Sequence, residues 1–204
     1  TTSNNNLAIG YKALSADTVG TKTTAIGFEA LMSQNFTSNT DSYNVAVGYT
    51  AGREITTGTQ NVLIGGLSGD AITTGANNVA MGTSSLGTCT TGTYNVALGD
   101  SALFATTTAS NNTAVGGGAL AANTTGASNA AVGYRALTTN TTAINCTALG
   151  KDALYANTTG GDNTGVGYNS LAANTTGASN TAVGALAGDT VSTGVENTLI
   201  GYAA

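Results

Sequence analysis

Histidine, tryptophan and proline are absent from this chain of 204 residues, and charged residues make up only 7% of it. An ordinary globular domain has about 25% charged residues, so acid–base catalysis and metal binding start from a poor set of side chains. Five basic residues and a net charge of −5 argue against nucleic acid as a partner, because phosphate binding needs a basic surface. No apolar run is long enough to cross a bilayer. We therefore expect no cofactor, no metal, no nucleic-acid partner and no membrane insertion by this segment.

The sequence is dominated by one motif, Asn-x-Ala-Val-Gly, which recurs with a 17-residue period. Its glycine recurs at Gly10, Gly27, Gly48, Gly65, Gly82, Gly99, Gly116, Gly133, Gly150, Gly167, Gly184 and Gly201. Ten of the eleven intervals equal this period, and the one from Gly27 to Gly48 is longer by four, which places a four-residue insertion within residues 34–42. A fixed period as short as this, with glycine punctuation, predicts a solenoid of short coils.

We expect residues 1–204 to form a single all-β solenoid domain, a parallel β-roll of about twelve 17-residue coils. Each coil should hold two short strands and two turns and should rise about 4.8 Å. The second strand carries a recurring leucine, such as Leu120, and the turns read Asn-Thr-Thr-Gly, as in Asn123–Gly126, with glycine at a positive φ. Because the chain opens without Met and lacks polar end caps, we expect a fragment or processed part of a longer fibre protein.

The first strand of each coil is apolar on both faces. The residue before the motif glycine, such as Val115, is apolar in every coil, and we expect it to face the core. The residue before that is nearly always alanine, which predicts that a second subunit packs on this column; the alternative is that alanine only fits a tightly wound surface. The predicted subunit interface comprises Ala8, Ala25, Ala46, Ala80, Ala97, Ala114, Ala131, Ala148 and Ala182.

The few charges pair by sign at the spacing of one repeat, which places the partners on neighbouring coils. The predicted ion pairs are Lys12 with Glu29, Arg53 with Asp70, and Arg135 with Asp152. Exposed pairs contribute about 0–1 kcal/mol, so they would fix the register more than the stability. Lys151 lies between Tyr134 and Tyr168 in one column, where a cation–π contact is expected.

An aromatic column directly after the motif glycine is the first candidate for a binding surface, because tyrosine rings bury area on sugars and flat polymers while offering a hydroxyl. It consists of Tyr11, Phe28, Tyr49, Tyr134, Tyr168 and Tyr202. The alternative is that these rings pack on one another or across a subunit boundary. No pair of carboxylates is left for glycoside hydrolysis: Glu54 and Asp70 lie on adjacent coils, but Arg53 is expected to pair with Asp70. We therefore predict no catalytic residues and no enzyme.

The two cysteines, Cys89 and Cys146, occupy different columns and lie more than three coils apart. At about 4.8 Å per coil their separation exceeds the limit of about 7 Å between Cα atoms for a disulfide. An intrachain bridge is not expected. Two roles stay open: small buried hydrophobic side chains, or a link between neighbouring subunits.

The segments Asn111–Gly116 and Asn77–Gly82 resemble the Asn-Ser-Val-Ala-Ile-Gly repeat of trimeric autotransporter adhesin heads, and similar repeats in bacteriophage tail fibres. The likeness spans the whole chain, although the coil is longer here and no coiled-coil stalk, membrane anchor or terminal chaperone domain is recognised. The resemblance implies a left-handed parallel β-roll, packed as a homotrimer around an axis, that serves adhesion at a surface.

These expectations combine into a non-enzymatic structural or adhesive fibre protein, extracellular and at a cell or virion surface, whose rigid rod serves surface attachment or receptor binding. Its expected partners are copies of itself, as a homotrimer or an end-to-end filament, and a host-surface glycan or protein. Two alternatives stay open: a self-polymerising structural filament, and an ice-binding solenoid whose flat threonine-rich faces order water.

Overall fold

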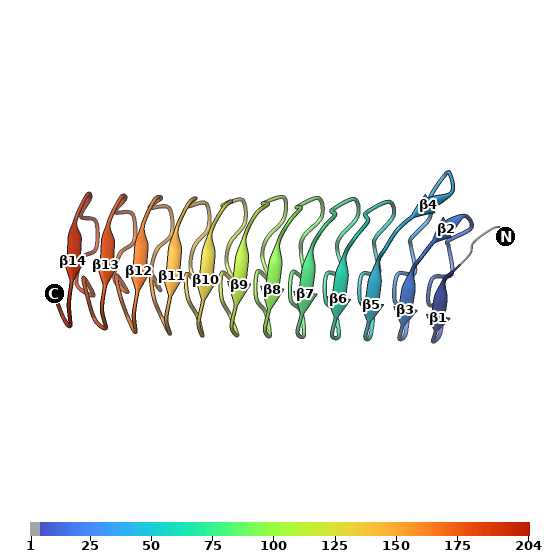
Figure 1. The fold of residues 1–204 in the computed structure, drawn as a ribbon, viewed down its shortest axis with the longest axis horizontal. Helices are drawn as coiled ribbons and strands as arrows, with labels where there is room; N and C mark the ends of the chain where they lie inside the picture. The colour runs from blue at the N-terminus through green and yellow to red at the C-terminus, as the bar shows by residue number, and fades with distance from the viewer. Residues whose placement is uncertain (1–4) are drawn as a thin grey trace.

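A computed structural model describes residues 5–204 as an all-β parallel solenoid of about eleven turns, drawn out into a straight rod with the two termini at opposite ends (Figure 1). Twelve strands form one parallel sheet along the rod, in the order β1-β3-β5-β6-β7-β8-β9-β10-β11-β12-β13-β14. β2 and β4 form a separate two-stranded sheet near the N-terminal end.

The strands of the long sheet are all three residues long. They are β1 (Leu7–Ile9), β3 (Thr24–Ile26), β5 (Val45–Val47), β6 (Val62–Ile64), β7 (Val79–Met81), β8 (Val96–Leu98), β9 (Thr113–Val115), β10 (Ala130–Val132), β11 (Thr147–Leu149), β12 (Thr164–Val166), β13 (Thr181–Val183) and β14 (Thr198–Ile200). The short sheet pairs β2 (Gly20–Thr21) with β4 (Thr40–Asp41).

The register follows the sequence period. Ala97 of β8 pairs with Ala114 of β9, one period further along the chain. Thr24 of β3 pairs with Val45 of β5, which lies four residues beyond one period. The insertion therefore leaves the long sheet unbroken, and its extra residues contribute β4 to the short sheet, at the N-terminal corner of the rod (Figure 1).

The prediction of two strands per coil is wrong for the regular coils. The segment after the motif glycine forms consecutive turns, and Leu120 within it has a φ of 51°, which is incompatible with an extended strand. Its backbone still bonds from coil to coil, since Leu120 N–H donates to the carbonyl of Ala136 at 3.0 Å. The positive φ predicted for glycine in the Asn-Thr-Thr-Gly turns is also wrong: Gly126 lacks one, but a Cβ there would clash with the carbonyl oxygen of Ala143.

The two faces of the strand are the reverse of the prediction. Ala114 is fully buried and Val115 partly exposed, and the same order holds along the sheet; only Ala8, in the first coil, is exposed. The other predicted interface alanines therefore line the core and cannot form a subunit interface. Their small size has a cause inside the coil, because buried leucines such as Leu120 come in from the opposite wall and leave room for only a methyl group. The alanines wrongly predicted to form an interface, all of them buried in the core, are Ala25, Ala46, Ala80, Ala97, Ala114, Ala131, Ala148 and Ala182.

Two strands that carry leucine in place of the inward alanine demonstrate this limit on side-chain size. In β6 the inward residue is Leu63 instead of alanine, and the opposite wall has Gly52 and Gly69 where most other coils have leucine. A Cβ on Gly52 would lie 2.7 Å from Leu63 Cδ1. Leu199 faces Gly188 in the same way, because a Cβ on Gly188 would lie 2.8 Å from Leu199 Cδ1. At these coils the core thus exchanges large and small residues between its two walls, as close packing requires.

Buried asparagines at the start of the motif connect most coils to the next. Asn112 Oδ1 accepts the backbone N–H of Asn129 at 3.0 Å, and Asn112 Nδ2 donates to the carbonyl of Gly126 at 3.0 Å. Each such bond contributes about 0.5–1.5 kcal/mol net, and an unpaired buried partner costs more. The ladder consists of Asn44, Asn61, Asn78, Asn95, Asn112, Asn129, Cys146, Asn163, Asn180 and Asn197.

Candidate binding surfaces

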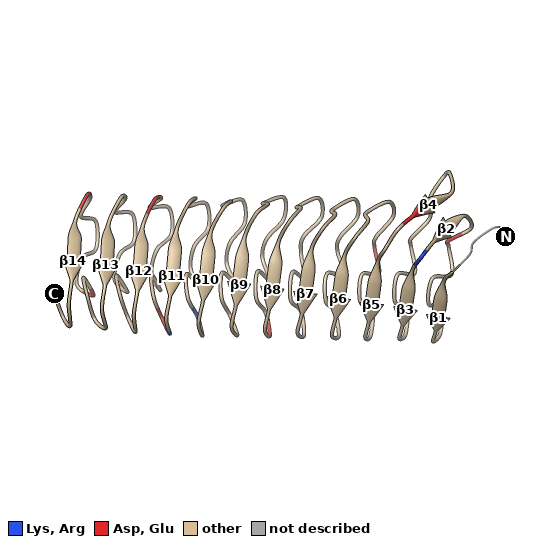
Figure 2. Cartoon of the chain, viewed as in Figure 1, with Lys and Arg blue, Asp and Glu red and all other residues tan. Residues whose placement is uncertain are grey.

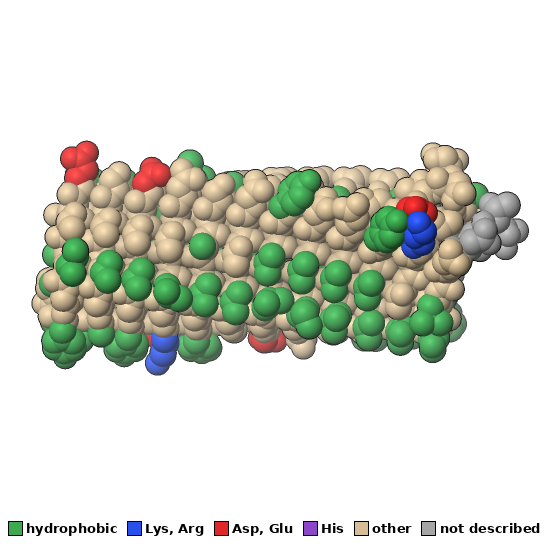
Figure 3. All heavy atoms as spheres, viewed as in Figure 1, with side chains coloured by type: hydrophobic (Ala, Val, Ile, Leu, Met, Phe, Trp, Pro, Cys, Tyr) green, Lys and Arg blue, Asp and Glu red, His purple; other side chains and the backbone are tan. Residues whose placement is uncertain are grey.

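An uncharged, mostly aliphatic surface runs along the outer face of the long sheet. It is made by the first and third residues of every strand, and none of these side chains is buried or charged. Met81 is 43% exposed and Leu149 48%. Figure 3 shows the row of hydrophobic side chains following the strands along the rod. We call this surface the aliphatic stripe; it occupies the face that sequence reasoning assigned to the core.

Charges are sparse along the rod (Figure 2), and one of the three predicted ion pairs forms. Arg135 Nε donates to Asp152 Oδ1 at 2.8 Å, which confirms that pair. Arg53 Nε bonds Glu54 on its own coil at 2.9 Å, so its predicted pairing with Asp70 is wrong. Burial raises the pKa of Asp70, and the positive charge of Arg53 opposes that rise.

The remaining predicted pair, Lys12 with Glu29, is also wrong. No ion pair joins them within the described part of the chain; Lys12 Nζ instead lies 5.3 Å from the ring centre of Tyr11. A pair across the widened coil was missed, because the insertion sets its partners at a spacing other than the period: Lys22 Nζ lies 2.6 Å from Asp41 Oδ2.

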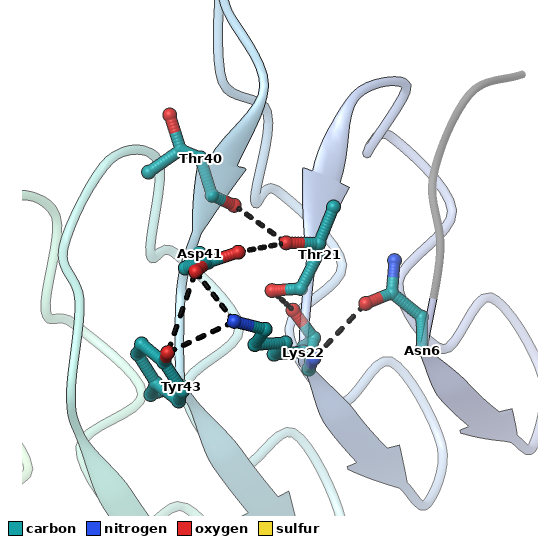
Figure 4. Close-up of polar contacts among 7 residues, drawn as sticks. Asn6, Thr21, Lys22, Thr40, Asp41 and Tyr43 are labelled. Atoms are coloured by element: carbon teal, nitrogen blue, oxygen red, sulfur yellow. Dashed lines mark hydrogen bonds and ion pairs between the residues drawn. The ribbon is translucent and has the colours of Figure 1, made fainter.

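Lys22 and Asp41 belong to a polar network at the N-terminal corner (Figure 4). Lys22 Nζ also donates to the Tyr43 hydroxyl at 3.0 Å, and Thr21 Oγ1 donates to Asp41. The hydrogen bonds from Lys22 and from Thr21 lower the pKa of the Asp41 carboxyl. The network joins the residues around β2 to those around β4 and so holds the inserted segment against the rod.

The aromatic column divides into two parts. At the N-terminal end Tyr11, Phe28 and Tyr49 stack on one another, with ring centres 5.1 and 5.3 Å apart. Further along, Tyr134 and Tyr168 are separated by Lys151, whose Nζ lies 5.6 Å from the ring centre of Tyr168. Among the described residues Lys151 makes no cation–π contact with Tyr134; that ring is met by Arg135, at 5.2 Å from Cζ. Tyr202 is highly exposed at the C-terminal end.

A hollow of about 380 Å³ lies beside the second part of this column, lined by Arg135, Lys151, Asp152, Tyr155, Tyr168, Asn169 and Ala172. Arg135 Cζ lies 4.9 Å from the ring centre of Tyr155, and Lys151 Nζ lies 3.8 Å from Asp152 Oδ2. Sequence reasoning found Arg135, Lys151, Asp152 and Tyr168 but missed Tyr155, the only tyrosine at its position in the repeat.

Both cysteines are buried and form no disulfide. Burial raises the pKa of the Cys89 thiol to about 11, and also raises the pKa of Cys146. Cys146 replaces asparagine in the ladder: its N–H donates to Asn129 Oδ1 at 2.9 Å, and its Sγ lies 3.3 Å from the carbonyl oxygen of Gly160. Of the two roles left open, burial in the core is the one the structure supports.

Within residues 5–204 no three cysteine, aspartate or glutamate side chains lie together as metal ligands would. The same residues contain no helix long and apolar enough to span a membrane. No protein-family model, curated protein or solved structure matches this chain.

Proposed function

We propose that this chain is the rigid rod of a non-enzymatic extracellular fibre, at a cell or virion surface, which assembles as a homotrimer through the aliphatic stripe and serves surface attachment or receptor binding. The observation that carries the proposal is the stripe. Its outward side chains are aliphatic apart from a threonine at the first position of six strands, and none of them is charged, whereas strands that face water usually carry lysine, glutamate and other charged residues.

The area of the stripe is that of a functional surface patch. Three residues of about 3.3 Å each across the strand and twelve coils of about 4.8 Å each along the rod give a patch of roughly 500–600 Å². That equals the largest apolar patches on typical monomers, which are often functional. Parallel sheets are normally covered on both faces, and here only the inner face is covered by the chain itself.

A partner of equal length and straightness covers such a stripe best, and a second copy of the chain has both properties. The flat strip also repeats every coil, so two copies can align over the whole rod in one register. Three copies would meet around an axis parallel to the rod, which agrees with the arrangement that the sequence resemblance implies.

Sedimentation equilibrium tests the assembly with matched variants. The proposal predicts three times the mass of one chain for the native protein, and a monomer for Leu149→Glu, which places a charge in the stripe. Thr142→Glu is the control, because Thr142 is exposed on a turn outside the stripe. A native monomer, or a trimer that survives Leu149→Glu, would contradict the proposal. Long polymers would favour the alternative of a self-assembling structural filament.

The ice-binding alternative has less support. The threonine pairs of the turns do align along the rod, but the first hydroxyl of each pair is engaged in the backbone of the next coil. Thr124 Oγ1 donates to the carbonyl of Thr141 at 2.9 Å, and Thr158 Oγ1 to that of Thr175 at 3.0 Å. Within the described turn pairs, the second threonine, such as Thr125, is therefore the exposed one whose hydroxyl is available to order water.

A further inference from the structure

We propose that the hollow beside Tyr155 binds an acidic sugar, that is, a pyranose ring that carries a carboxylate. It gathers residue types that are rare elsewhere in the chain. Two of the five basic residues and two of the eight tyrosines line it, together with Asp152 and Asn169. A volume of about 380 Å³ lies within the range of about 300–1,000 Å³ for ligand sites.

The hollow follows from the repeat. Tyr155 is five residues after a motif glycine, and the same position on the next coil is Ala172. A ring on one coil and a methyl group on the next leave a step in the surface. Lys151 and Tyr168, each one residue after a motif glycine, lie along another side of this step, so the site spans the coils of β10, β11 and β12.

Charge makes the hollow selective for an anion. Asp152 is 7% exposed and holds both cations, Arg135 through Nε and Lys151 more loosely. Two positive charges against one negative leave a net charge of +1 in a chain whose net charge is −5. Among the described residues no protein acceptor bonds the terminal nitrogens of Arg135, so they are available to a carboxylate in the two-pronged geometry that guanidinium favours.

The rings distinguish a sugar from a simple anion. A phosphate or an isolated carboxylate needs only the cations, whereas Tyr155 and Tyr168 add apolar ring faces of the kind on which a pyranose stacks. The amide of Asn169 supplies two donors and one acceptor for sugar hydroxyls. The combination of cations, ring faces and an amide therefore fits an acidic sugar better than an acidic peptide, whose flexible side chains offer no flat ring.

This assignment names a ligand class for the proposed attachment role and rests on that role, although binding itself requires one chain only. The experiment is calorimetric titration of the native protein with a galacturonate tetrasaccharide, compared with the neutral galactose tetrasaccharide. We expect saturable binding of the acidic sugar and binding at least about tenfold weaker for the neutral one, since charge-assisted hydrogen bonds are lost.

The variants are matched in chemistry. Lys151→Gln and Tyr155→Ala should each weaken galacturonate binding about tenfold, by removing a charge or a ring face. The controls are Lys12→Gln and Tyr94→Ala, a cation over a tyrosine ring and an exposed tyrosine, both outside the hollow, and they should bind as the native protein does.

Three results would overturn the assignment: no saturable binding of galacturonate, equal losses in the control variants, or competition by polyglutamate at the same concentration as galacturonate. Sedimentation of the same samples separates this test from that of the rod. A trimer that does not bind galacturonate overturns the hollow and leaves the rod, whereas a monomer that binds it overturns the trimer and leaves the hollow.

Discussion

Asn112 in the regular part of the rod and Gln34 in the widened coil connect neighbouring coils in different ways. Asn112 makes the same two bonds as most other asparagines of its ladder, to the backbone one coil away. Gln34 is also fully buried, but its Nε2 donates to Thr23 and Asp17, at 3.0 and 3.2 Å, and its Oε1 accepts from Asn44 at 2.8 Å. A regular coil thus needs one repeated side chain, whereas the irregular coil needs several different ones, each used once.

The largest effect is expected from Gly116→Ala in the regular part. Gly116 has a φ of 132°, and a Cβ would lie 2.5 Å from the carbonyl oxygen of Gly133. Backbone strain and the clash should together cost about 2–4 kcal/mol of unfolding free energy, measured by urea denaturation. Gly66→Ala is the matched control, because a Cβ there meets nothing within 4 Å, and it should be neutral. Equal losses for the two variants would contradict the close approach as the cause.

The next largest losses of stability are expected from changing the two side chains that connect neighbouring coils, Asn112 in the regular part and Gln34 in the widened coil. Asn112→Ala should cost about 2–3 kcal/mol, because it leaves the N–H of Asn129 without its acceptor and removes one of the two amide donors, Asn112 and Asn123, from the carbonyl of Gly126. Gln34→Ala should cost a similar amount, but the loss should stay at the N-terminal end. Hydrogen exchange checks the comparison: protection should fall on both sides of Asn112 in one variant, and only near residues 17–44 in the other. Uniform loss of protection in both would remove the distinction.

A gain in stability is expected at Cys146, which replaces asparagine in the ladder. Cys146→Asn would offer an amide oxygen to the backbone N–H of Asn163 and an Nδ2 donor to the carbonyl of Gly160, as Asn112 does for Asn129 and Gly126. Stability should rise by about 1 kcal/mol, seen as a higher midpoint in urea. A lower midpoint would mean that the ladder does not accept asparagine at this coil.

The smallest effect concerns the exposed pair of the widened coil. The pKa of Asp41 is lowered in the folded chain, so its contribution is present above the unfolded pKa and is lost as pH falls through the folded value. Between pH 7 and pH 5 the native protein and Asp41→Asn should therefore differ by a constant amount, and the difference should vanish only below the ordinary pKa of 3.8. A difference that disappears between pH 7 and pH 5 would contradict this.

The register could be predicted from the sequence, because a fixed period allows only one parallel pairing, as Ala97 with Ala114 shows. The inward face could not be derived from alternation alone, since alternation does not tell which face is inside. That choice depends on the opposite wall, where Leu120 has a left-handed backbone that a strand pattern does not predict. The sequence did contain a signal, the exchange of Leu63 with Gly52 and Gly69.

The candidate site was predictable in part for the same reason. Arg135 and Asp152 occupy one column, so their pairing follows from the period. Arg53 finds an acid on its own coil, which the period does not reveal. Tyr155 lies in a column whose residue type changes from coil to coil, so its importance does not follow from the period but depends on the hollow that it forms with the neighbouring coil.

Contact between copies of the chain through the aliphatic stripe is the central claim. The most direct test is the distance between spin labels on different subunits, in a background with Cys89→Ala and Cys146→Asn. One label goes at Val132→Cys in the stripe and the other at Thr125→Cys on the exposed turn. We expect a short inter-subunit distance for the label at Val132 and a longer one for the label at Thr125. The reverse order, or no dipolar coupling at either position, would contradict the claim.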